Sequence, residues 1–207
     1  MLSCAEVAPP PGGEVDRTSP YLIGSQPEDG AINVILDNRI VLRFSEQVVE
    51  PRAGRAVYIS PRPVREPKLR WKGDRLEIVL PDSFQTDETY VVSLSTDIAD
   101  LRNNKLDSTG AIAFSTGPSI DSGYVSGTVF SQMRPAAGVL VGLYSQLPFG
   151  DTPTGVDSVF PEYVTQTNQQ GQFLLQYLPQ REYHLIAFQD QNWNERLDPF
   201  REMFALP

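Results

Sequence analysis

Residues 190–202, near the end of the chain, carry the side chains best suited to binding a metal ion. Oxygen-bearing residues recur there at alternating positions and again further along; the candidate ligands are Asp190, Asn192, Asn194, Asp198 and Glu202. Ca²⁺ takes about six to eight oxygen ligands and tolerates irregular geometry, so this spacing predicts a calcium loop of low affinity. An EF-hand is excluded, because the sixth position is Glu195 rather than glycine and the twelfth is Arg201 rather than glutamate. The alternative is that the same side chains hydrogen-bond the backbone in successive Asx turns and bind nothing.

Nucleophilic catalysis has few residues to draw on. A hydrolase of the Ser-His or Cys-His type needs a histidine beside its nucleophile, and the chain has one histidine, His184, and one cysteine, Cys4. His184 lies in an alternating pattern, opposite in phase to Tyr183 and Leu185, which is typical of an ordinary strand residue. The sequence has no Gly-x-Ser-x-Gly elbow, phosphate loop or dinucleotide fingerprint. We therefore predict that the protein is not an enzyme.

Several further polar residues fall at predicted turns in the first half of the chain. They are Asp29, Asn33, Glu46, Asp97 and Asp100. Aspartate and asparagine at turns commonly hydrogen-bond their own backbone and fix the loop. We interpret these residues as structural rather than catalytic or ligand-binding.

The overall charge and composition exclude several classes of function. The 207 residues include 17 Lys and Arg against 26 Asp and Glu, a formal net charge of −9. This acidic balance argues against nucleic-acid binding, which depends on clustered basic side chains. No apolar run reaches the roughly 18 residues of a membrane span. One cysteine and one histidine exclude an intramolecular disulfide and a Cys/His zinc site. Separately, we expect the protein to be a monomer.

The first part of the chain, residues 1–18, is expected to form a flexible tether. The proline and glycine run at residues 8–13 favours extended, polyproline-like backbone. Leu2-Ser3-Cys4-Ala5 resembles the cleavage site of a bacterial lipoprotein, in which the cysteine is lipidated and becomes the first residue. Such a signal also needs a basic and an apolar region before the cysteine, and three residues precede it here. Cys4 is therefore either a lipidation site or a free thiol.

Alternating patterns dominate residues 19–118 and predict short β-strands. Ile40, Leu42 and Phe44 place apolar side chains on one face of a strand. Two alternating runs, 69–71 and 76–80, flank Lys72-Gly73-Asp74-Arg75 and predict a hairpin. Further strands are predicted around residues 90–94 and 112–114. Short strands with regularly spaced turns are typical of a β-sandwich, with Leu42, Phe44, Trp71, Leu76, Ile78 and Phe114 in its core.

Specific motifs of this half match a known family. They are PEDGAINV at 27–34, IVLRFSEQV at 40–48, TYVVSL at 89–94, DIAD at 97–100 and AFSTG at 113–117. Together they resemble the bacterial Ig-like domain of S-layer and cell-surface proteins, over residues 19–117. The sequence departs from the family at Asn103-Asn104, where Gly-Asn is usual. We expect the turn to survive, because asparagine tolerates left-handed backbone better than most residues.

The second half, residues 119–207, also shows strand patterns. Residues 139–144 are apolar on both faces, which predicts a central strand, and 165–173 predict strand, turn and strand. Residues 145–160 predict a recognition loop. GTV at 127–129, GVLV at 138–141, the turn at 167–173 and the run at 178–185 are similar to a carboxypeptidase-regulatory-like, or prealbumin-like, β-sandwich. That module is a common non-catalytic part of bacterial surface proteins.

The sequence therefore predicts an all-β protein: two tandem Ig-like/prealbumin-like β-sandwiches after a flexible Pro/Gly-rich N-terminal tether. The boundary falls at residues 117–123, and the second sandwich is expected to need one more strand beyond Pro207. The arrangement resembles Bacteroidetes-type Ig-like surface lipoproteins. This resemblance implies a non-catalytic adhesin or spacer, extracellular or in the outer membrane of the bacterial cell envelope, held by a lipid anchor only, with a protein or glycan partner that the sequence does not identify. The alternative is a non-catalytic accessory region of a larger extracellular carbohydrate- or protein-processing enzyme.

Overall fold

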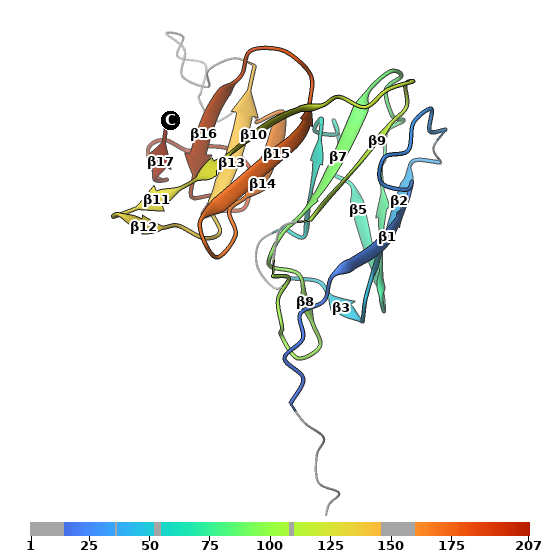
Figure 1. The fold of residues 1–207 in the computed structure, drawn as a ribbon, viewed down its shortest axis with the longest axis horizontal. Helices are drawn as coiled ribbons and strands as arrows, with labels where there is room; N and C mark the ends of the chain where they lie inside the picture. The colour runs from blue at the N-terminus through green and yellow to red at the C-terminus, as the bar shows by residue number, and fades with distance from the viewer. Residues whose placement is uncertain (1–14, 36, 52–54, 108–109, 146–159) are drawn as a thin grey trace, which may run out of the picture.

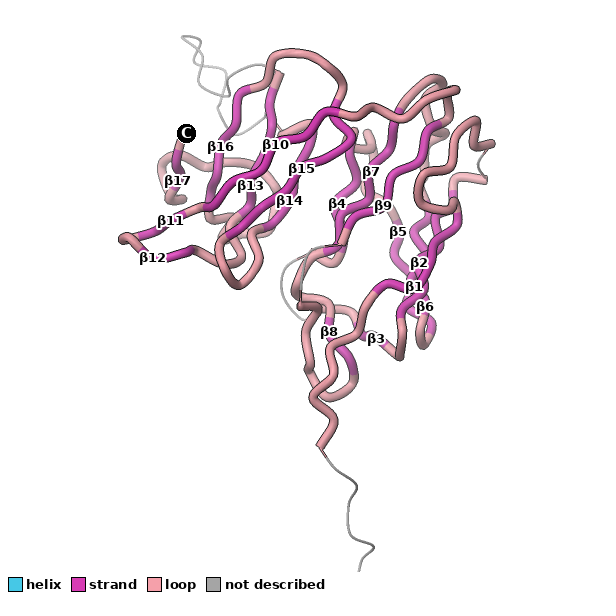
Figure 2. Tube along the Cα trace, in the orientation of Figure 1, coloured by secondary structure: helices cyan, strands magenta, loops and turns pink. Residues whose placement is uncertain are grey.

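The computed structural model describes residues 15–35, 37–51, 55–107, 110–145 and 160–207. Every regular element within these residues is a β-strand (Figure 2). The described residues include no helix long and apolar enough to cross a membrane. The first half contains β1 (Leu22–Gln26), β2 (Arg39–Phe44), β3 (Val48–Val49), β4 (Val57–Ser60), β5 (Lys68–Lys72), β6 (Arg75–Val79), β7 (Thr89–Leu94), β8 (Ala99–Asp100) and β9 (Ala111–Ser115). The second half contains β10 (Gly123–Thr128), β11 (Phe130–Ser131), β12 (Arg134–Pro135), β13 (Leu140–Tyr144), β14 (Tyr163–Gln166), β15 (Gln172–Leu178), β16 (His184–Phe188) and β17 (Phe204–Ala205).

The first half is a sandwich of two antiparallel sheets. One has the strand order β1-β2-β6-β5 and the other β4-β7-β9, while β3 pairs with β8. Alternation along β2 buries Ile40, Leu42 and Phe44 between the sheets, as predicted. The hairpin β5–β6 turns at Gly73, whose φ of 62° suits glycine. The resulting core is a single hydrophobic cluster made only of residues from this half.

Trp71 does not belong to the innermost part of this core. The other predicted core residues are at most 1% exposed, whereas Trp71 is partly buried and packs against the cluster from the edge strand β5. An indole in a half-covered position leaves one side of the ring toward solvent, which is why alternation alone overestimates its burial.

In the second half, a sheet of order β14-β13-β16-β17 lies against the β10–β15 pair. The prediction of a central strand at 139–144 is confirmed, because β13 lies between β14 and β16 and all its residues are buried. One face of this sheet packs on β10 and β15 around Val141, Leu143 and Leu175. The other face carries Leu140, Ile186 and Phe188 and is covered by the segment that follows β16, which contributes Leu197.

The two sandwiches lie side by side, with the β4-β7-β9 sheet of the first facing β14 and β15 of the second (Figure 1). All residues of β4 and β7 are buried, including those that alternate away from the core of the first sandwich. Asp16 and Ser19 are attached to the first sandwich: Asp16 pairs with Arg102 at 2.7 Å, and the Ser19 hydroxyl donates to Asp107 at 2.7 Å. Three of the eighteen residues predicted as tether, Asp16 to Thr18, thus lie on or beside the folded unit.

Candidate functional site

The junction between the sandwiches is built like a protein interior. Tyr58 on β4 is 5% exposed and packs into the second sandwich with Leu140, Val164 and Phe188. The Tyr58 ring therefore completes a hydrophobic cluster of the other half of the chain. Burial of its hydroxyl, together with the carboxylates of Asp190 and Asp97, raises the pKa of Tyr58, so the side chain stays protonated.

A group of four charged side chains joins the two halves beside Tyr58. Glu195 of the second sandwich is buried and forms ion pairs with Arg55 and Arg62 of the first. Both arginines also contact Glu66, at 2.9 and 2.7 Å. The hydrogen bond from Arg55 lowers the pKa of Glu66. Two guanidinium groups pair with the Glu195 carboxylate and so offset the free-energy cost of burying its charge.

A third contact across the junction is a buried polar one. The side-chain oxygen of Gln166 on β14 accepts hydrogen bonds from the Ser95 hydroxyl at 3.0 Å and the Thr96 hydroxyl at 3.4 Å. All three side chains are buried, so these bonds are formed away from solvent. Hydrophobic, ionic and hydrogen-bonded contacts thus hold the sandwiches in one orientation.

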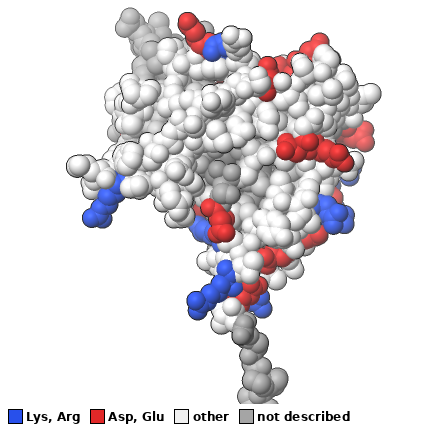
Figure 3. Space-filling view, viewed as in Figure 1, with Lys and Arg blue, Asp and Glu red and all other residues white. Residues whose placement is uncertain are grey.

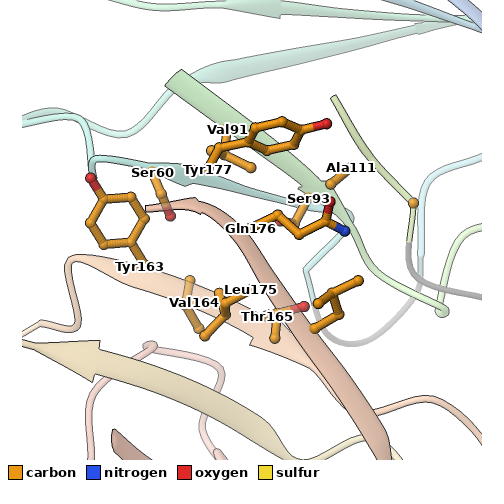
Figure 4. A pocket seen from close by; sticks show the side chains of 12 residues that line it. Ser60, Val91, Ser93, Ala111, Tyr163, Val164, Thr165, Leu175, Gln176 and Tyr177 are labelled. Atoms are coloured by element: carbon orange, nitrogen blue, oxygen red, sulfur yellow. The ribbon is translucent and has the colours of Figure 1, made fainter. Parts of the chain in front are cut away.

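A small cleft opens between β7 of the first sandwich and β15 of the second (Figure 4). Its volume is about 80 Å³, and its walls include Ser60, Ser93, Tyr163 and Gln176. The hydroxyl of Tyr163 is buried and has no hydrogen-bond partner among the described residues. A cleft of this size has room for water molecules that could satisfy that hydroxyl, but not for a drug-sized ligand.

A larger cavity of about 180 Å³ lies at the same junction beside Tyr58. Its polar walls come from Arg55 and Asp97 of the first sandwich and from Gln166, Asp190 and Trp193 of the second. Partial burial of Asp190 raises the pKa of its carboxyl group, against several backbone hydrogen bonds that lower it. The indole of Trp193 is half-exposed.

The residues predicted as calcium ligands stabilise their own loop. Asp190 accepts hydrogen bonds from the backbone N–H groups of Asn194 and Glu195, and Glu202 accepts from those of Gln191 and Asp198. Asn192, Asn194 and Asp198 each accept from a backbone N–H two residues on, which is the Asx-turn geometry. These bonds hold the loop that places Leu197 over the hydrophobic cluster. The Asx-turn interpretation accounts for three of the five side chains, and Asp190 and Glu202 hold the loop through bonds to other backbone N–H groups.

Calcium binding by the same loop stays a prediction. Carboxylate oxygens that accept one backbone N–H keep a further lone pair, so the loop bonds do not exhaust their capacity. Thermal melts in EDTA and in millimolar Ca²⁺ test it: the expected difference should vanish in Asp190→Ala, whereas identical melts would leave only the Asx turns.

Three carboxylates that lie far apart in the sequence meet at the base of the first sandwich. Ligand atoms of Asp16, Glu46 and Asp100 lie within 4.8 Å of one another. Asp100 is buried and accepts from the backbone N–H groups of Arg102 and Asn104. Partial burial and the neighbouring carboxylates of Asp100 and Asp16 raise the pKa of Glu46. Asn103 in this loop has a φ of 68°, which confirms the expected left-handed turn.

Within the part of the chain that the structure describes, His184 has no catalytic partner beside it in any contact that the structure shows. His184 is exposed; it is the first residue of β16 and pairs with Tyr144 of β13. Cys4 and most of the predicted recognition loop, residues 146–159, lie outside the described residues. Acidic and basic side chains are interspersed on the face drawn in Figure 3, and that face carries no large basic patch of the kind that binds nucleic acid.

Comparison with known proteins identifies part of the chain. Residues 16–116 match the family model of the bacterial Ig-like domain, which covers the whole first sandwich. No curated protein matches the chain. Bacterial Ig-like domains are typical of non-catalytic modules of bacterial surface and cell-envelope proteins. The β-sandwich expected from the motifs of the first half is therefore confirmed.

Proposed function

We propose that the protein is a surface-anchored structural module of the bacterial cell envelope, which holds two β-sandwiches as one rigid spacer or adhesin segment. The observation that carries this proposal is the junction: Tyr58 and Glu195 each reach across it and are buried in or against the other half. Interfaces between freely moving domains are more polar and seldom exchange core side chains. The bacterial Ig-like domain in the first half supports the location.

The second sandwich serves in this proposal as a carboxypeptidase-regulatory-like module, non-catalytic like the first. Its residues supply no histidine besides the exposed His184. The protein acts as a monomer. It has no nucleic-acid partner, in keeping with its net charge of −9. Cys4 carries the lipid, and residues 1–18 link it to the first sandwich. Acyl chains are then the sole membrane anchor, because the sandwiches themselves are acidic.

Fractionation of cells tests the anchor. The chain is expressed behind a lipoprotein leader that ends at Ser3, and we expect it in the membrane fraction. Cys4→Ser should move the protein to the soluble fraction, whereas Ser3→Ala, which keeps a small residue before the cysteine, should not. Membrane association that persists in Cys4→Ser would rule out a lipid anchor.

Distance measurements test the rigid spacer separately. Spin labels at Lys68→Cys and Gln172→Cys, both exposed, report on the first and second sandwich in a Cys4→Ser background. We expect one narrow distance distribution, because the junction fixes the orientation. A broad distribution in the otherwise unchanged protein would contradict the spacer even if the anchor were correct.

A further inference from the structure

The cavity of about 180 Å³ beside Tyr58 has features that a rigid spacer does not require. Its walls come from both sandwiches, so the fixed junction also fixes the spacing of its polar groups. Binding sites occur preferentially at domain interfaces, and here polar groups make up most of the wall beside a smaller apolar part. Trp193, Tyr58 and Leu140 supply that apolar part.

Two hydrogen-bonding groups of this cavity have no partner among the described residues. Gln166 is 8% exposed, and its oxygen is engaged by Ser95 and Thr96, whereas its amide nitrogen forms no hydrogen bond there. That nitrogen points toward Gly138, where a Cβ atom would lie 3.9 Å from it, and Gly138 also lines the cavity. The hydroxyl of Tyr58 likewise has no partner within the described residues. Neither atom is sealed off within the protein, and both residues line the cavity, so both groups can bond a ligand or water that enters it.

The acceptors in the wall are carboxylates with spare lone pairs. Asp97 accepts from Lys105 at 2.8 Å, and its other oxygen lies 3.3 Å from the Ser95 hydroxyl, which shares its single hydrogen with Gln166. Asp190 accepts one backbone N–H at each oxygen, at 3.1 and 2.8 Å. An ionised carboxylate offers about four acceptor positions, so both groups can accept further hydrogen bonds.

This mixture of groups selects the chemistry of the ligand. A cation would meet the guanidinium of Arg55 and the amide N–H of Gln166, whereas an anion would meet Asp97 and Asp190. A neutral compound with several hydroxyl groups, each both donor and acceptor, pairs with donors and acceptors alike. The half-exposed indole of Trp193 adds an aromatic surface for the C–H face of a ring. The volume is below the about 300 Å³ of drug-sized sites and suits one six-membered ring.

We propose that the cavity binds one hexopyranose unit, free or at the end of a glycan, stacked on Trp193. Gln166 and Arg55 donate to its hydroxyl oxygens, and Asp97 and Asp190 accept from its hydroxyl groups. This inference goes beyond the spacer, since a spacer needs no ligand and the site does not depend on the membrane anchor.

Tryptophan fluorescence and saturation-transfer NMR test the site in the full chain. Trp71→Phe leaves Trp193 as the sole tryptophan, so its emission reports on the cavity. The probes are the methyl glycosides of glucose, mannose and galactose, N-acetylglucosamine, and maltotriose for a glycan end. We expect saturable binding of at least one sugar with a dissociation constant in the roughly millimolar range, as suits so small a ligand.

Variants assign the binding to the cavity. Trp193→Ala should weaken the saturation-transfer signal about tenfold or more, and Trp193→Phe should restore part of it. Phe200→Ala is the matched control, because Phe200 belongs to the same loop, is 90% exposed and does not line the cavity. Far-UV circular dichroism checks that each variant is folded.

Three results would overturn the proposal. One is the absence of binding by every sugar up to about 50 mM, well above the expected constant. Another is binding that survives in Trp193→Ala, which would place the sugar elsewhere. The third is a response to N-acetyl-arginine amide or inorganic phosphate without any response to sugars, which would make the cavity a site for a charged group. Binding by maltotriose but not by the single sugars would support the glycan-end form.

Discussion

The first sandwich encloses one hydrophobic cluster made only of its own residues, whereas the second divides its buried residues between two faces of one sheet. One of those two clusters is completed by Tyr58, which belongs to the first sandwich. Burying a large aromatic side chain contributes several kcal/mol in the interior of a domain, roughly 3–5 by truncation. We infer that the second sandwich depends on the first for stability more than the first depends on the second.

The largest expected effect comes from Phe44→Asp. Phe44 is 1% exposed, and a charge placed there would lie unpaired in the main cluster. We expect a loss of more than about 4 kcal/mol and unfolding of both sandwiches, seen as loss of near-UV circular dichroism. Arg39→Asp, exposed on the same strand, should leave the fold intact. A second sandwich that stays native in Phe44→Asp would contradict this dependence.

Tyr58→Ala tests the same dependence at the junction. Removing the ring leaves a cavity in the cluster of the second sandwich, with an expected cost of about 3 kcal/mol. Urea unfolding is followed with Trp193 in a Trp71→Phe background and with Trp71 in a Trp193→Phe background. The Trp193 transition should move further than the Trp71 transition. Tyr124 of the second sandwich is 74% exposed, so Tyr124→Ala should shift neither unfolding transition.

Glu195→Gln tests the ionic part of the junction. The variant leaves Arg55 and Arg62 with Glu66 as their remaining acidic partner, and we expect a loss of about 2 kcal/mol, discounted because both arginines are partly exposed. The spin-label distance distribution should broaden as well. The control is Lys72→Gln: Lys72 is exposed, and losing its ion pair with the partly buried Glu77 should cost less than about 1 kcal/mol. Equal losses in the two variants would remove the special role of the junction.

Glu46→Gln should give the smallest effect. The pKa of Glu46 is raised above 4.5 in the folded protein, so the folded state binds more protons than the unfolded state just above that pH. The free energy of unfolding should therefore fall as the pH rises through this window. Glu46→Gln should flatten that slope and raise neutral-pH stability by about 0.5 kcal/mol or less. A steeper slope in the variant, measured by urea titrations from acid to neutral pH, would contradict the assigned cause.

Local patterns predict what depends on neighbours in sequence. The hairpin β5–β6, the buried face of β2 and the left-handed Asn103 follow from alternation and turn chemistry. The short pair β3–β8 does not, because strands of two residues carry no periodicity. The candidate ligands at 190–202 were found by their spacing, which is equally the spacing of consecutive Asx turns.

What the sequence could not show is how the two halves meet. Both faces of β7 are buried, one in the core of the first sandwich and the other against the second sandwich. The pattern of a single strand is the same for a strand buried within one domain, so it does not reveal the second sandwich. Tyr58, Gln166 and Trp193 lie far apart in the sequence, and nothing in the type or spacing of these residues brings them to one cavity. In the sequence, Glu195 served only to exclude an EF-hand, because it stands where glycine is required. In the fold it forms ion pairs with Arg55 and Arg62 of the first sandwich.

Tyr58 also has a consequence for the order in which the chain folds. Synthesis proceeds from the N-terminus, and domains generally fold as units in that order. Tyr58 emerges long before Leu140 and Phe188, and the first sandwich can place its ring while the later residues are still being made. The second sandwich then condenses onto a surface that already exists. In a newly made chain, the folded first sandwich would therefore provide the surface on which the strands of the second sandwich pack.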